Sequence, residues 1–450
     1  MMHDGGRSAR WALLLLAIAA LAAIGADAAV KPRAVLLVPF DATALERDEQ
    51  WVGQGVAEVI GLGLDQHPAF VQVEDARVRA VSRPEAWTEA IVAQAARTLR
   101  ADVAMFGRVA RSGTELVVHP RVLEIKGPAV DVVALEPVTV PEGELLVRMA
   151  PLASAYARTL KVPLTDAEVR RMDKASLPTR SLKAFELFAR AAVAVTLRPG
   201  QEGNEQAVDL LARAMEIDPN FAVAWYTQGV VHQALGNRWK AAAQFRGSTQ
   251  LDSSYPEPYK ALGDLSMAAP RRLFDQAVEA YSKAIDLRPF YADAHVGLGD
   301  AKAAKGDIDG AVAAYTKALS YNPINPRVHM SLGKIYYTEK GLYYESVNAY
   351  KKAIDLDTSS VEAHMGLGEV YEDKGLYKEA VDEYRRVIEL DGKHTGAMYN
   401  LALVYEKTDP RAAVAQWERY IALASQLPSE KDWVDVARQH LKKLKSQFKD

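Results

Sequence analysis

The chain has 450 residues, of which 49% are hydrophobic and 25% charged, and its formal net charge is −3. This composition is typical of a folded protein with two or three domains and excludes a disordered chain. The small net charge gives no general attraction to nucleic acid or anionic lipid, and the absence of cysteine excludes disulfides, thiolate metal sites and cysteine nucleophiles.

The first thirty residues have the three parts of a secretory signal peptide. Arg7 and Arg10 form a basic start, residues 11–24 are all apolar, and Ala26-Asp27-Ala28 has the small residues of a cleavage site. The apolar run is shorter than the ~20 residues that a spanning helix needs. We therefore expect a signal peptide at 1–28, a periplasmic location and no stable membrane insertion after cleavage. An uncleaved N-terminal anchor is the alternative.

Residues 31–164 alternate short apolar runs with helical patterns. Strands are predicted over 34–40, 70–73, 102–109, 115–125 and 129–138, and helices over 53–66, 87–99 and 142–160. This order predicts an α+β domain with a mixed sheet. A linker with a short helix is expected over 165–180, where Thr165 and Thr179 can cap helices.

Short motifs within residues 32–123 carry a family resemblance. They are Val38-Pro39-Phe40, Gly53-Gln54-Gly55-Val56-Ala57, Ala101-Asp102, Phe106-Gly107-Arg108-Val109 and Gly113-Thr114-Glu115-Leu116. Together they make the region similar to the TolB amino-terminal-like domain of bacterial envelope proteins. The resemblance implies a small accessory domain of envelope assemblies without catalysis. Gly53 and Gly55 alone do not form a dinucleotide fingerprint, because Glu58 stands where its third glycine is needed.

From residue 181 onward a pattern of about 34 residues recurs. One series of large residues is followed four positions later by Gly or Ala: Trp225, Tyr259, His295, His329, His364 and Met398. A second series is followed four positions later by an aromatic ring: Ala241, Ala277, Ala311, Ser346 and Ala380. Such offsets place each series on one helix face, and the glycines between the two series end the first helix.

This helix–turn–helix period resembles the tetratricopeptide repeat family. The resemblance implies about seven units over residues 181–427, the first of them degenerate. An apolar stripe through Trp433, Ala437 and Leu444 predicts a capping helix at 428–450. The predicted fold class is thus multidomain, with an N-terminal α+β (mixed sheet) domain followed by an all-α tetratricopeptide superhelical solenoid.

No constellation in the sequence supports catalysis, a cofactor or a metal. Phosphate-loop, nucleophile-elbow and zinc-helix motifs are absent from the sequence. His295, His329 and His364 recur in consecutive repeats, but helices stack ~8–10 Å apart, whereas zinc needs nitrogens ~2.0–2.1 Å away. We therefore expect these rings to pack in the core. The start of a calcium loop at Asp307-x-Asp309-Gly310 lacks the other ligands.

The first helix of each unit lines the concave groove that such solenoids use for binding. Groove positions of the family correspond here to Tyr226, Val230, Lys260, Asp264, Val296, Asp300, Met330, Lys334, Tyr337, Met365, Glu369, Glu372, Tyr399 and Leu403. They mix adaptable apolar residues with carboxylates. We expect a protein or peptide segment as partner, amphipathic and with basic residues, and no nucleic acid. The family's carboxylate clamp is not expected, because Met330 and Met365 replace its polar residues.

The sequence thus predicts an exported periplasmic protein–protein interaction scaffold, without enzymatic activity, in a cell-envelope assembly. The alternative is a ligand- or glycan-binding sensor that acts through the N-terminal domain. That alternative requires a concave pocket with converging polar groups within residues 31–164.

Overall fold

The computed structural model describes residues 31–81, 86–141, 143–270 and 273–447. They form two compact units that divide between Phe221 and Ala222. The predicted signal peptide at 1–28 lies outside the described residues. None of the helices described has both the length and the apolar character needed to cross a bilayer.

A mixed six-stranded sheet is the centre of the first unit. Its strands are β1 (Arg33–Leu37), β2 (Phe70–Gln72), β3 (Val103–Ser112), β4 (Glu115–Lys126), β5 (Ala129–Ala134) and β6 (Val138–Val140). The order is β2-β1-β3-β4-β5, with β6 also on β4; β1 runs parallel to β2 and β3, and the other pairs are antiparallel. The predicted mixed sheet is confirmed.

Two predicted elements of this unit are each divided in the structure. The single strand expected over 129–138 is wrong, because β5 pairs with residues 121–126 of β4 and β6 pairs with residues 116–118. The helix expected over 142–160 is likewise two helices, α5 (Leu145–Met149) and α6 (Leu152–Thr159). Pro137 and Pro151 stand at these interruptions, where proline lacks the N–H that a continuous element requires.

Helix α2 (Trp51–Leu64) corresponds to the helix predicted over 53–66, and most of its residues are buried. A methyl group added to Gly53 would lie 2.1 Å from the Phe40 carbonyl oxygen, and one on Gly63 would lie 2.3 Å from Ser176 Oγ. These glycines let α2 approach its neighbours closely. The smaller helices α3 (Asp75–Val81) and α4 (Glu89–Thr98) complete the sheet region.

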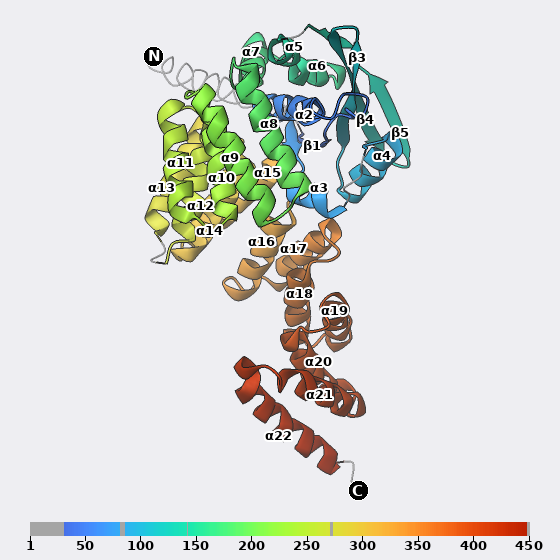
Figure 1. Ribbon diagram of the computed structural model, residues 1–450. Coiled ribbons are helices and arrows are strands. Elements are labelled where there is room, and N and C mark those ends of the chain that lie inside the picture. The colour runs from blue at the N-terminus through green and yellow to red at the C-terminus, as the bar shows by residue number, and fades with distance from the viewer. Residues whose placement is uncertain (1–30, 82–85, 142, 271–272, 448–450) are drawn as a thin grey trace, which may run out of the picture. The chain divides into compact units, whose positions relative to one another are not determined.

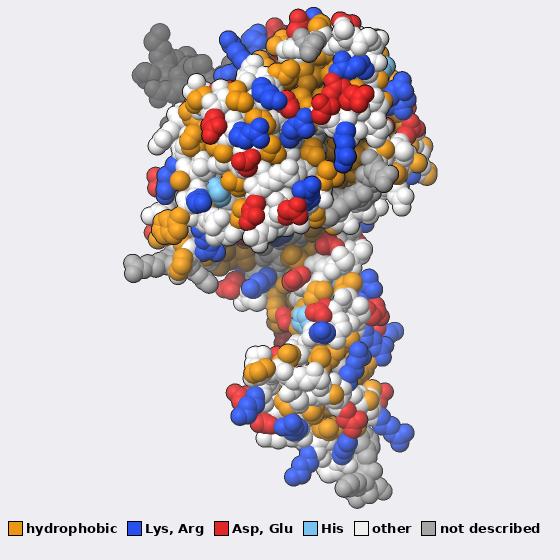
Figure 2. Space-filling model, in the orientation of Figure 1, with side chains coloured by type: hydrophobic (Ala, Val, Ile, Leu, Met, Phe, Trp, Pro, Cys, Tyr) orange, Lys and Arg blue, Asp and Glu red, His pale blue; other side chains and the backbone are white. Residues whose placement is uncertain are grey.

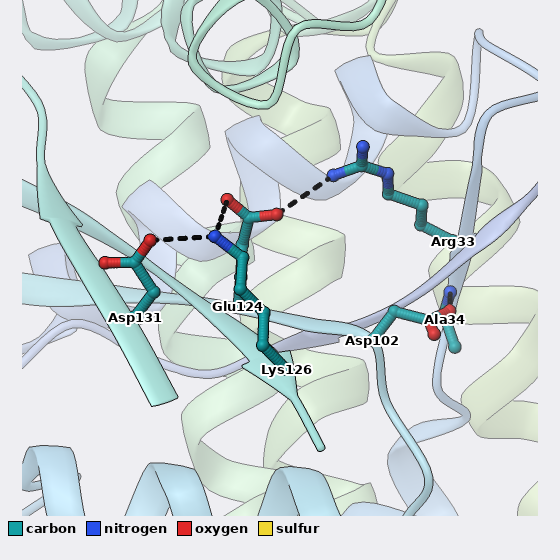
Figure 3. A network of polar contacts seen from close by, with 6 residues as sticks. All are labelled: Arg33, Ala34, Asp102, Glu124, Lys126 and Asp131. Atoms are coloured by element: carbon teal, nitrogen blue, oxygen red, sulfur yellow. Dashed lines mark hydrogen bonds and ion pairs between the residues drawn. The ribbon is translucent and has the colours of Figure 1, made fainter. Parts of the chain in front are cut away.

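A polar network closes one end of the sheet (Figure 3). Glu124 lies between Arg33, at 3.4 Å, and Lys126, at 4.0 Å, and Lys126 reaches Asp131 at 2.8 Å. Asp102 accepts the backbone N–H of Ala34 at 2.8 Å. Arg33 lies in β1, Glu124 and Lys126 lie in β4, Asp131 lies in β5, and Asp102 directly precedes β3, so the contacts link strands that are far apart in sequence.

The first helical hairpin belongs to the same compact unit as the sheet. It consists of α8 (Leu182–Leu197) and α9 (Gln201–Ile217), and α8 lies beside α2 (Figure 1). The rings of Phe185 and Trp51 are 6.4 Å apart across this contact. Residues 165–180 hold α7 (Asp166–Ala175), which begins with a complete capping box between Thr165 and Glu168 and also contacts α2.

The second unit is all-α and follows the predicted repeat. Its helices pair in order into antiparallel hairpins, shown in Figure 1 from yellow-green to red. They are α10 (Ala222–Ala234), α11 (Arg238–Leu251), α12 (Pro256–Met267), α13 (Phe274–Leu287), α14 (Ala292–Ala304), α15 (Ile308–Tyr321), α16 (Pro326–Thr338), α17 (Tyr343–Leu356), α18 (Val361–Asp373), α19 (Tyr377–Leu390), α20 (Thr395–Thr408), α21 (Pro410–Ala424) and α22 (Lys431–Gln447).

Small residues and rings pack as the two series predict. In three repeats, a methyl group added to the first-helix glycine would lie 2.6–2.7 Å from the tyrosine ring of the second helix; the pairs are Gly263–Tyr281, Gly299–Tyr315 and Gly368–Tyr384. Gly306 turns between its two helices with a φ of 83°, in the left-handed region that favours glycine. The predicted helix–turn–helix solenoid is therefore confirmed.

Candidate functional site

The three recurring histidines fasten the loops between repeats. His295 Nε2 lies 2.9 Å from the Pro289 carbonyl oxygen and His364 Nε2 lies 3.4 Å from that of Thr358, in each case six residues earlier. His329 bonds the carbonyl of Pro323 in the same way, and burial lowers the pKa of His295 and His329 below the usual value. No group of three potential metal ligands occurs in the part of the chain that the structure describes.

The fourteen predicted groove residues lie on the first helices of the repeats, α10, α12, α14, α16, α18 and α20. Val296 is only 5% exposed and packs in a core cluster with Leu332 and Ile335, so its assignment to the groove is wrong. The other predicted positions are half-buried or exposed. Over α18–α22, the face seen in Figure 2 shows acidic, basic and apolar side chains interspersed.

Several apolar groove residues bury part of their surface against neighbouring residues of the solenoid. The Tyr399 ring lies 5.0 Å from that of Trp417 and 5.4 Å from those of Tyr420 and Trp433. Tyr226 packs on the rings of Phe245 in α11 and Tyr255 before α12, and Met330 and Leu403 lie against the core. These residues support the groove wall and present only part of their surface to a partner. Val230, by contrast, is exposed.

Three of the predicted groove carboxylates hold the tyrosine hydroxyl of their own repeat. The pairs are Asp264–Tyr281 at 2.8 Å, Asp300–Tyr315 at 2.6 Å and Glu372–Tyr384 at 3.0 Å. Each carboxylate also faces a cation, in the same order Lys260, Arg327 and Lys407. Burial and then the neighbouring carboxylate raise the pKa of each tyrosine far above its usual value. The hydroxyls therefore stay protonated and donate within the scaffold.

The hairpin of α16 and α17 departs from this pattern. Lys334 occupies the position of Asp264 and Asp300, so no carboxylate of that hairpin accepts from Tyr350. In neighbouring repeats the next unit supplies a second polar group, Ser331 to Tyr315 and Asn400 to Tyr384, but here that position is Gly366.

Tyr350 is only 6% exposed, and its hydroxyl makes no hydrogen bond with any described residue. The hydroxyl oxygen is not fully enclosed, because Tyr350 lines a pocket, whereas the hydroxyls of Tyr281, Tyr315 and Tyr384 donate within their own repeats.

A pocket of about 510 Å³ opens at this break, between α16 and α18. It is lined by Lys334, Tyr337, Thr338, Tyr350, Val361, Glu362, Met365, Gly366, Glu369, Asp391 and His394. Four of these residues were predicted for the groove: Lys334, Tyr337, Met365 and Glu369. The repeat pattern placed Tyr350 in the core, and the other lining residues were not predicted: Thr338, Val361, Glu362, Gly366, Asp391 and His394.

Glu369 differs from the other predicted groove carboxylates. Among the described residues it has neither an ion pair nor a side-chain hydrogen bond, whereas Asp264, Asp300 and Glu372 each have both. Burial raises the pKa of Glu369, and the nearby Glu372 raises it further, against the lowering effect of Lys334. The pocket thus brings together a tyrosine hydroxyl and a carboxylate that are not bonded to each other, whereas the equivalent groups elsewhere in the groove form hydrogen bonds.

Comparison with known families identifies the repeats. Residues 274–306, 299–339 and 337–375 match a family described as TPR repeat, and residues 361–394 match one described as Tetratricopeptide repeat. A search of curated protein sequences finds no match to this chain. The resemblance of residues 32–123 to the TolB amino-terminal-like domain stays a prediction.

Similar solved structures include YrrB, described as a TPR protein with an unusual peptide-binding site; it is 21% identical, with 44% of this chain and 99% of that chain covered and a TM-score of 0.38. PilW, described as a type IV pilus biogenesis factor, is 17% identical, with coverages of 46% and 94% and a TM-score of 0.41. MamA from Desulfovibrio magneticus RS-1 is 21% identical, with coverages of 38% and 96% and a TM-score of 0.34. The family matches show that residues 274–394 are tetratricopeptide repeats, as their period predicted.

Proposed function

We propose that this protein is an exported, non-enzymatic interaction scaffold that binds a protein segment in the concave groove of its repeats, as part of a cell-envelope assembly. The observation that supports this proposal most strongly is the pocket between α16 and α18. There the side chains of Tyr350, Glu369 and Lys334 make no hydrogen bond or ion pair with a described residue, whereas the corresponding tyrosine and carboxylate side chains of other repeats bond to each other. A partner's donors and acceptors can therefore bind these groups without breaking a hydrogen bond inside the scaffold.

The composition of the pocket favours an amphipathic segment with basic residues. Three carboxylates and one ammonium line it, together with the apolar surfaces of Tyr337, Val361 and Met365. Methionine and tyrosine adapt well to different apolar contacts. The opposite charge would attract a basic segment, and the apolar wall would hold its hydrophobic side chains.

Export and the envelope role rest on the sequence alone. The signal-peptide pattern at 1–28 supports the first, and the TolB-like motifs within residues 32–123 support the second. The intact mass of the protein isolated from the periplasm tests export: loss of residues 1–28 is expected. A chain retained in the cytoplasm would contradict it, and a membrane-bound chain of full mass would indicate the uncleaved anchor.

Affinity purification with two matched charge reversals tests the groove. Glu369→Lys changes the pocket, whereas Glu379→Lys changes an exposed glutamate in the first turn of α19, outside the pocket. We expect the first variant to lose at least about tenfold of its recovered partner, the effect of about 1.4 kcal/mol, and the second to keep it. Circular dichroism checks that both variants fold. Full recovery of every partner by Glu369→Lys would contradict the proposal.

A further inference from the structure

We infer that the pocket between α16 and α18 is a subsite for one basic side chain, lysine or arginine, of the bound segment. This inference rests on the proposed function and specifies its partner at one position. The aliphatic stem of the side chain would lie against Met365 and Tyr337, and its charged head would face Glu369 and the Tyr350 hydroxyl.

Tyr350 supplies an unused acceptor at the pocket. Its ring is held as in the other repeats, with a methyl group added to Gly333 meeting the ring at 3.0 Å. On the other side, a methyl group added to Gly366 would lie 2.7 Å from the hydroxyl oxygen, so the hydroxyl lies directly against a residue with no side chain. A side chain at 366 would therefore collide with the ring and its hydroxyl. Tyr350 also lines the pocket, and its hydroxyl makes no hydrogen bond with a described residue, so it can accept from an ammonium or guanidinium group of a partner.

The charges around the pocket select a cation. Glu362 and Glu369 make no ion pair with another described residue, and among the described residues the carboxylate of Asp391 accepts only the backbone N–H of Lys393. His394 Nδ1 accepts the backbone N–H of Ala397 and thereby caps α20. The pKa of Glu369 is raised chiefly by burial, the situation that an incoming cation relieves.

Among the lysine, arginine and acidic residues of the pocket lining, only Lys334 would repel a bound cation. It is exposed, so its ammonium group can remain in water. The walls suit the stem of a basic side chain. Val361, Met365 and Tyr337 are half-buried, and long basic side chains bury their methylenes along such surfaces while the head finds a polar partner. A volume of about 510 Å³ is within the range of ligand pockets.

Titration of the full chain with capped single amino acids tests the inference. The protein carries methionine labelled with ¹³C in the methyl group, and loss of one resonance in Met365→Leu assigns the reporter. The probes are N-acetyl, N′-methylamide derivatives of lysine, arginine, norleucine and glutamate. We expect lysine or arginine to shift the Met365 resonance saturably. Norleucine, which has a similar stem without the charge, should bind at least about tenfold more weakly, because it cannot donate a charged hydrogen bond to Glu369.

Two substitutions give effects of opposite sign. Glu369→Gln should weaken the basic probe about tenfold, and Lys334→Met should strengthen it on the order of threefold by removing a like charge. Glu379→Gln, outside the pocket, should change nothing. Equal responses to lysine and norleucine, no response to either, or a preference for glutamate that Lys334→Met abolishes would each overturn the inference. The proposed scaffold function would survive those results if Glu369→Lys still lost the native partner, so the two failures are distinguishable.

Discussion

The hairpins α14–α15 and α16–α17 place a tyrosine at the same packing position but give its hydroxyl different surroundings. Tyr315 donates to Asp300 at 2.6 Å, whereas Tyr350 faces Lys334 in the corresponding position and makes no hydrogen bond with a described residue. Both rings pack against a first-helix glycine. The packing of the ring is thus part of the repeat fold, whereas the hydrogen-bond partner of its hydroxyl differs from one repeat to the next. A repeat can therefore gain a binding pocket without altering its core.

The largest expected contrast is between the two first-helix residues of these hairpins. Asp300→Ala removes the acceptor of Tyr315 and should lower the free energy of unfolding by about 1–3 kcal/mol. Lys334→Ala should change it by less than about 0.5 kcal/mol, because Lys334 is exposed and has no internal partner among the described residues. Urea denaturation of the full chain, compared at the midpoints, measures both. Equal losses would remove the distinction between the hairpins.

Removal of single hydroxyl groups should separate the hairpins less strongly. Tyr281→Phe deletes the donor to Asp264 and should cost about 0.5–1.5 kcal/mol, the net contribution of a typical hydrogen bond. Tyr350→Phe deletes a hydroxyl without a partner and should leave the stability unchanged or slightly raised. The same denaturation experiment measures both variants, with Tyr384→Phe as a second bonded case. A clear loss in Tyr350→Phe would show that its hydroxyl is satisfied internally.

The smallest expected effect concerns the pH dependence of stability at Glu369. Burial raises the pKa of this carboxyl in the folded chain, so between its ordinary pKa and the raised value the folded state holds more protons than the unfolded state. Stability contributed by this group therefore falls as the pH rises through that window. Glu369→Gln should be slightly more stable than the unchanged protein at neutral pH, and the advantage should disappear below the ordinary glutamate pKa. Thermal unfolding measured across pH tests this, and a destabilised Glu369→Gln at neutral pH would contradict it.

The repeat period predicted most of the solenoid because packing alone determines it. The ring of Tyr384 packs on Gly368, and every repeat needs this contact whatever its surface residues are. The spacing of the two positions therefore recurs in the sequence. The strand division at Pro137 was missed because β5 and β6 use different parts of β4, a long-range pairing without a local signal beyond the proline.

The candidate site was only partly predictable. Glu369 and Glu372 lie on the same helix, and their spacing does not tell which one reaches Tyr384; the structure assigns this bond to Glu372. The sequence did hold a signal for the pocket. Lys334 stands where the neighbouring repeats have a carboxylate, and Gly366 stands where the preceding repeat has Ser331, which contacts the tyrosine of the hairpin before it. Val296 was misplaced because its side chain packs into a core cluster, which the groove position alone does not reveal.

Photocrosslinking in the native envelope tests the central claim most directly. A photoreactive residue replaces Met365 in the pocket and, as the matched control, Tyr344, which is 77% exposed on α17 and outside the pocket lining. We expect one recurrent protein adduct from position 365, absent from position 344 and reduced by a second change, Glu369→Lys. Equal trapping from both positions, or no protein adduct from position 365, would contradict the claim that this groove is the binding surface.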